Sequence, residues 1–167
     1  MLLPGDLPAL RPVPAPLLHL TLAFIGNTPP DRLGAASEAV RAAAAVVAPF
    51  DVVLDGVGRF PVRGLPNVVW LGAGEGADGL ILLGQRVRAA LRERSVPFDD
   101  KPFRPHITLA RVKRDVERAA FVELTAALRA VEAPSLRFRA DAVHLVESRL
   151  SPRGPRYASL QTVPLSA

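Results

Sequence analysis

The sequence His19-Leu20-Thr21-Leu22-Ala23 recurs almost unchanged as His106-Ile107-Thr108-Leu109-Ala110, about half the chain later. Side chains alternate between the two faces of a strand, so each histidine shares a face with the threonine two positions on. The apolar residues between and after them then anchor the opposite face. A repeat at this separation predicts a duplicated fold, in which two lobes of similar structure face each other across a cleft.

The rest of the pattern mixes strands with helices and contains no linker. Residues 1–16 are rich in proline and predict an extended arm. Alternating or β-branched runs predict strands, and apolar residues at helical spacing after Asp31, Asp78 and Asp115 predict helices. The predicted strands are 17–24, 50–54, 67–72, 103–112, 136–150 and 156–165, and the predicted helices are 32–48, 79–94 and 116–131. Residues 58–61 and 72–76 look like turns.

This order of elements predicts the α+β class. We expect a single domain over residues 1–167, with a pseudo-two-fold, bilobal arrangement. Two antiparallel sheets would face a central cleft, and the helices would lie outside.

The composition restricts the chemistry that is available. The chain lacks cysteine and has three histidines, which excludes a thiolate nucleophile, disulfides and a cysteine zinc site, and makes a histidine metal site unexpected. We therefore expect no metal and no cofactor. The net charge of +5 suits a phosphate-bearing partner, although a GC-rich genome also produces such arginine-rich chains. No segment predicts a signal peptide or a membrane span, so a cytoplasmic protein without a membrane partner or an obligate protein partner is expected.

Paired His-x-Thr strands suit the cleavage of a phosphodiester. In-line displacement needs a base on the attacking oxygen and an acid on the leaving oxygen, on opposite sides of phosphorus. Imidazole titrates near neutral pH, with a reference pKa of about 6.5, so one ring can accept a proton while the other donates one. Two opposed lobes would each contribute one ring, and the threonine hydroxyls could stabilise the charge that develops on the non-bridging oxygens.

The two motifs, with their surroundings, resemble the two-histidine (2H) phosphoesterases, and most closely the bacterial RNA 2′,3′-cyclic phosphodiesterases, a 2′-5′ RNA ligase-like family. The resemblance rests on residues 19–26, 104–111, 145–151 and 154–157. It implies the bilobal fold and the opening of a terminal 2′,3′-cyclic phosphate to a 2′-phosphate, without metal or nucleotide cofactor. By analogy His19 is the general acid and His106 the general base, although the symmetric motif does not itself fix these roles.

Residues near the two motifs could support the reaction, and the resemblance implies such a role for Arg111 and Tyr157. Arg111 would bind phosphate, but on an ideal strand it faces away from His106, so this role needs a bulge or bend. Arg104, Lys101 and Lys113 could follow an RNA backbone or could simply be solvated. Base stacking or RNA contact is the functional alternative to packing for Phe24, Phe103 and Tyr157. Family members usually place a short strand and a helix before the first motif, where this chain has its proline-rich arm. Two explanations are open: the start codon is misassigned, or the N-terminal lobe lacks these two elements.

Other functions remain open at this point. The substrate could be a 2′-5′ oligonucleotide, cleaved or ligated, or a cyclic nucleotide. The chain could also be a non-catalytic module that binds RNA ends, although the intact pairs of histidines and threonines argue against it. A ribonuclease that cuts internal bonds would need a further group at the 2′-OH, which the sequence does not provide. His144 lacks the motif and is expected to be structural.

Overall fold

The computed structural model describes residues 7–115, 117–133, 135–152 and 154–167, and it contains three α-helices, a short 3-10 helix and seven strands in the α+β arrangement that the sequence predicts. The elements in chain order are β1 (Leu10–Pro12), η1 (Ala15–Leu17), α1 (Pro30–Ala44), β2 (Phe50–Phe60), β3 (Val68–Ala73), α2 (Ala77–Glu93), β4 (His106–Val112), α3 (Arg118–Ala130), β5 (Leu136–Ala140), β6 (Ala142–Ser151) and β7 (Gly154–Pro164). None of the described helices has the length and apolar character needed to cross a bilayer.

The chain forms two compact units. The first unit comprises Met1–Thr21, Val53–Glu75 and Pro105–Arg137, and the second comprises Leu22–Val52, Gly76–Arg104 and Phe138–Ala167. Both histidine motifs begin in the first unit.

An antiparallel sheet with the strand order β1-β4-β3-β2-β5 is the framework of the first unit. The predicted strand pair is confirmed as β2 and β3, which form a continuous register from Gly56↔Gly72 to Phe60↔Val68. Strand β4 pairs with β3 on one side and with β1 on the other. Strand β1 therefore forms an edge of this sheet.

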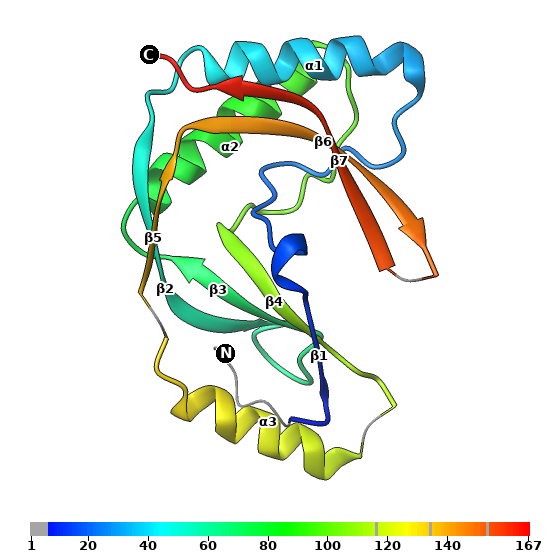
Figure 1. Ribbon diagram of the computed structural model, residues 1–167, viewed down its shortest axis with the longest axis vertical. Helices are drawn as coiled ribbons and strands as arrows, with labels where there is room; N and C mark the ends of the chain where they lie inside the picture. Colours follow the sequence, from blue (N-terminus) through cyan, green and yellow to red (C-terminus); the bar gives the residue numbers. More distant parts are fainter. Residues whose placement is uncertain (1–6, 116, 134, 153) are drawn as a thin grey trace. The chain divides into compact units, whose positions relative to one another are not determined.

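Helix α3 covers one face of this sheet, as Figure 1 shows. Leu124 of the helix is fully buried, and so are Val69 of β3 and Ala110 of β4. Val57 and Val112 pack on the same cluster. Because side chains alternate along each strand, the face opposite α3 carries the other set of residues.

The second unit packs helices α1 and α2 with the hairpin β6–β7 (Figure 1). Small residues of α1 such as Ala39 and Ala43 lie against Leu83 and Leu91 of α2, and Val143 of β6 completes the core. Alanine permits close approach of the two helices, because its side chain adds little to the interaxial distance. The predicted hairpin is confirmed, with a register shift at Leu145/Val146.

Several boundaries differ from the predicted ones. Residues 136–150 form two strands, β5 and β6, which are separated at Asp141. Gly58, Arg59 and Phe60 belong to β2, and Gly72 belongs to β3, so these residues are not in turns. The three predicted helices exist, but none of the three aspartates is the N-cap: Pro29, Gly76 and Glu117 occupy those positions. Residue 116, where the third helix was expected to begin, lies outside the described residues.

The predicted strand over residues 17–24 is wrong in extent, because only Leu20 makes a β-bridge. The prolines at positions 12, 14 and 16 remove backbone donors, and the chain forms the 3-10 helix η1 there instead. Residues Ala110, Arg111 and Val112 of β4 are already paired with β1, a strand within the segment that the sequence predicted as an extended arm. The first motif therefore makes a single β-bridge to β4, between Leu20 and Ile107.

Candidate active site

The two motifs lie side by side in the first unit. Leu20 and Ile107 form an antiparallel bridge. Residues advance in opposite directions along antiparallel chains, so His19 lies beside Thr108 and Thr21 beside His106. Cα atoms of such neighbours are about 4.5–5.5 Å apart. The histidines were expected on opposed lobes, but direct pairing of the motifs places both in one compact unit.

All four polar residues share the face opposite α3. Leu20 and Ile107 face the same way across their bridge, and the histidines and threonines beside them face the other way. His106 and Thr108 are half-buried, whereas His19 and Thr21 are exposed. The arrangement brings two imidazoles and two hydroxyls to one face of the sheet.

A bulge in β4 adds Arg111 to this face. Trp70 of β3 pairs with Thr108, but Val69 pairs with Ala110, so β4 contains one extra residue at Leu109. Leu109 and Ala110 are both buried, as expected where a bulge interrupts the alternation. Arg111 pairs with Val68, which lies two residues from Trp70 and thus on the same face. Because of the bulge, Arg111 lies on the same face of the sheet as His106, whereas an ideal strand would place it on the opposite face.

An aromatic cluster that the sequence did not predict packs against His106. The Phe60 ring meets the imidazole edge-to-face, with centroids 5.1 Å apart and an interplanar angle of 85°. The Trp70 ring lies 6.1 Å from the imidazole and 5.2 Å from the Phe60 ring. Such geometry is typical of favourable ring contacts and restricts the orientation of the imidazole.

Two glycines create the space for the indole. A Cβ atom on Gly58 would lie 2.2 Å from Trp70 Cζ2, and one on Gly72 would lie 2.7 Å from Trp70 Cζ3. The ring therefore lies flat on the backbone of β2 and β3, where any side chain would displace it. The indole Nε1 is buried and has no hydrogen-bond partner among the described residues, so packing alone holds the ring. The spacing Gly58-x-Phe60 and the single tryptophan of the chain are the sequence features from which this cluster could have been predicted.

The orientation of His19 is set by the backbone. Its Nδ1 lies 2.8 Å from the carbonyl oxygen of Leu17 at the end of η1. A carbonyl oxygen can only accept, so Nδ1 carries the hydrogen and donates it. In the neutral ring Nε2 is then the nitrogen without a hydrogen. The 3-10 turn that replaces the predicted strand thus fixes the tautomer of the first histidine.

Of the remaining predicted residues, Lys113 is exposed in the first unit directly after β4, and the others belong to the second unit. Phe24 is 63% exposed, which keeps it available for stacking. Phe103 packs on α2 instead: a Cβ atom on Gly84 would lie 2.9 Å from its ring, and the Arg88 guanidinium lies 5.6 Å from its centroid. Arg104 is exposed immediately before β4.

Tyr157 and Lys101 also lie in the second unit. Tyr157 is exposed on β7 opposite Ser148. Lys101 donates to the Asp99 carboxylate at 2.7 Å, and this hydrogen bond lowers the pKa of that carboxyl. The ion pair offsets the charge that Lys101 could offer to a phosphate.

The third histidine has a different environment. His144 of β6 pairs with Thr162 of β7, and its Nδ1 lies 2.9 Å from the threonine hydroxyl. The sequence motif gave His144 no threonine, but the hairpin provides one across the strands. Neither side chain lies in the first unit, which contains both motif histidines.

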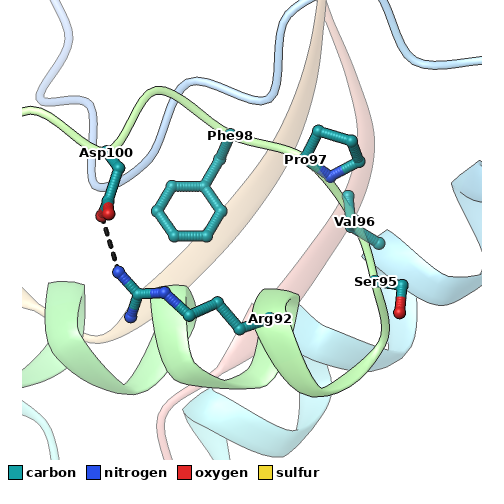
Figure 2. Close-up of a pocket in the computed structure, with 6 residues that line it drawn as sticks. All are labelled: Arg92, Ser95, Val96, Pro97, Phe98 and Asp100. Atoms are coloured by element: carbon teal, nitrogen blue, oxygen red, sulfur yellow. Dashed lines mark hydrogen bonds and ion pairs between the residues drawn. The ribbon is translucent and has the colours of Figure 1, made fainter.

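The second unit contains a shallow pocket of about 310 Å³, drawn in Figure 2. The Arg92 guanidinium lies 5.0 Å from the Phe98 ring centroid and 2.6 Å from the Asp100 carboxylate. This carboxylate neutralises the arginine, so the pocket offers little to an anion. None of the predicted site residues lines it.

No group of three or more histidine, aspartate or glutamate side chains is close enough to hold a metal ion within the part of the chain that the structure describes. Of the residues that the sequence singled out, the site face carries His19, His106, Thr21, Thr108 and Arg111.

Comparison with known proteins gives consistent matches. The family model described as the 2′-5′ RNA ligase superfamily matches residues 8–151. The RNA 2′,3′-cyclic phosphodiesterase of Thermus thermophilus is 37% identical over 157 residues, which are 90% of this chain and 73% of that protein. The protein of the same name from Aeropyrum pernix is 34% identical over 145 residues, which cover 87% of this chain and 80% of the relative.

Solved structures show the same fold. A crystal structure of a Thermus thermophilus protein matches with a TM-score of 0.75 at 34% identity, and the match covers 95% of this chain and 83% of that one. E. coli LigT complexed with 3′-AMP matches with a TM-score of 0.74 at 28% identity and the same coverage. With the family model matching most of its length, the chain belongs to the 2′-5′ RNA ligase superfamily.

Proposed function

We propose that this protein is an RNA 2′,3′-cyclic phosphodiesterase that hydrolyses a terminal cyclic phosphate to a 2′-phosphate. The observation that carries the proposal is the pairing of the two His-x-Thr motifs on the face opposite α3. The curated relatives of this name, at 37% and 34% identity over most of the chain, support the same activity.

His106 is the proposed general base. It removes a proton from water, the water oxygen attacks phosphorus, and the bond from phosphorus to O3′ breaks on the opposite side. The contacts with Phe60 and Trp70 hold the imidazole in one orientation, so that proton transfer starts from a fixed geometry. The family analogy assigns the base to His106 and the acid to His19, and the pH dependence of the variants tests both roles.

His19 is the proposed general acid. Its Nδ1–H donates to the carbonyl oxygen of Leu17, which holds the ring in one orientation. The proton on Nε2 is then delivered to O3′ as that oxygen leaves. The protons balance: His106 takes one proton from water, and His19 gives one proton to the leaving O3′, which becomes the 3′-hydroxyl. Each ring returns to its starting state by exchange with solvent.

Thr21, Thr108 and Arg111 are the proposed ligands of the non-bridging oxygens. Hydroxyl donors aimed at these atoms stabilise the charge that builds up in the transition state. The guanidinium can add a charge-assisted hydrogen bond from the same face. The pathway needs no metal, since these groups and the two imidazoles supply the proton transfers and the positive charge.

The histidines can be tested as a unit. His19→Ala and His106→Ala should each reduce kcat/KM on a 2′,3′-cyclic phosphate by about 10²–10⁴-fold. The double variant should lose far less than the product of the two factors, because either deletion already leaves the displacement incomplete. His144→Ala is the matched control and should stay within a few-fold of the wild type. An active double variant, or a His144→Ala variant as inactive as the others, would place the chemistry elsewhere.

A further inference from the structure

Arg11 lies beside Arg111 on the site face. The two are register partners on the adjacent strands β1 and β4, and both are exposed. Leu10 and Val112, the next pair, pack on the α3 cluster, so the two arginines point to the opposite face. That face also carries His106 and Thr108. Arg11 lies outside both His-x-Thr motifs and has no part in the mechanism above.

Within the part of the chain that the structure describes, no carboxylate neutralises this pair. Neither guanidinium has an ion pair with a carboxylate among the described residues. Other arginines of the chain do form ion pairs with carboxylates. Arg137 pairs with Glu75 at 2.7 Å, and Arg139 pairs with Asp51 at 3.3 Å. Like charges directly opposite each other on a sheet are unfavourable, and an anion held by both removes the penalty.

We infer that Arg11 binds a second phosphate, the one on the 5′ side of the terminal nucleoside. The inference rests on the proposed function, in which Arg111 and the two motifs hold the cyclic phosphate itself. From Arg111 the neighbouring strand on one side, β3, presents Val68 and Trp70, which offer no charge. On the other side, β1 is the last strand of the sheet and presents Arg11 beside Arg111, one strand further from the histidines of β4. The site would therefore select an RNA end over a nucleoside with a free 5′-hydroxyl.

Two product-like ligands isolate this contact. Adenosine 2′-phosphate has only the phosphate left by the reaction, and adenosine 2′,5′-bisphosphate also carries the second one. Calorimetric titration of the wild type should give tighter binding of the bisphosphate by about tenfold, the lower end for a charge-assisted hydrogen bond because both guanidiniums are exposed. In Arg11→Ala this ratio should fall close to one. Arg11→Lys keeps the positive charge but loses the planar guanidinium that can bind a phosphate through two hydrogen bonds, so it should retain an intermediate ratio.

Arg129→Ala is the matched control. It removes the same charge from an exposed position on α3, the helix that covers the opposite face of the sheet, and it should leave the ratio as in the wild type. Arg111→Ala should weaken both ligands together. A wild-type ratio near one, or an Arg11→Ala variant that retains the wild-type preference, overturns the inference. If the preference is present but the wild type does not hydrolyse adenosine 2′,3′-cyclic phosphate, the proposed activity fails and the second phosphate site stands.

Discussion

Gly58→Ala tests whether the flat packing of Trp70 holds His106, the proposed general base, in place. The new Cβ atom would lie 2.2 Å from Trp70 Cζ2. Carbon atoms in contact prefer about 3.5–4.0 Å, so the indole must move by more than about 1 Å. Because the ring contacts both Phe60 and His106, the shift reaches the imidazole.

The expected cost has two parts. Overpacking of this kind destabilises by about 1–3 kcal/mol, which for a chain of this size lowers Tm by about 2–4 °C for each kcal/mol. A displacement of about 1 Å in a reacting group can reduce the rate by about 10²-fold. We therefore expect Gly58→Ala to remain folded at 25 °C and to lose one to two orders of magnitude in kcat on a 2′,3′-cyclic phosphate, with a smaller change in KM.

The chain offers a close control for this variant. Gly56 lies on the same strand and face, two residues away, and a Cβ atom there would meet nothing within 4 Å. Gly56→Ala should keep wild-type kcat and Tm. In a Trp70→Leu background the added effect of Gly58→Ala should shrink, because the clash is gone. Equal kcat for Gly58→Ala and Gly56→Ala in folded proteins would refute the claim that the indole positions His106.

Three further predictions concern the chemical step. Thr21→Ala and Thr108→Ala should each be impaired by at most about 10²–10³-fold in kcat, and wild-type rates in both would show that the hydroxyls do not face the substrate. Activity should persist in EDTA, and its loss on chelation with rescue by a divalent ion would rule out the mechanism. The pH profile of kcat/KM should be bell-shaped; His19→Ala should remove chiefly the high-pH limb and His106→Ala the low-pH limb, and the reverse assignment would exchange acid and base.

The shared face of His106 and Thr108 could be predicted from the sequence because it depends on local alternation. His-x-Thr on a strand puts both side chains on one face whatever the strand pairs with, so His106 and Thr108 could be assigned together. The repeat also predicted that the two motifs act as a pair. It could not show whether they come from opposed lobes or lie side by side, since strand pairing is a non-local property.

Two other features depended on contacts that the sequence does not encode locally. The bulge at Leu109 turns Arg111 to the site face, and a bulge is visible in the register of the partner strand rather than in the strand's own residues. The packing of Trp70 over Gly58 joins two strands. Competition for one edge of β4 explains why the first motif keeps a single bridge at Leu20.

The identity of the product tests the central claim most directly. Adenosine 2′,3′-cyclic phosphate would be incubated with the wild-type protein in EDTA, and the product would be separated by chromatography against authentic 2′- and 3′-phosphates. Protonation of O3′ by His19 predicts adenosine 2′-phosphate as the product, and His19→Ala and His106→Ala should form it at rates about 10²–10⁴-fold lower. Formation of the 3′-phosphate, or wild-type rates in either variant, would contradict the account.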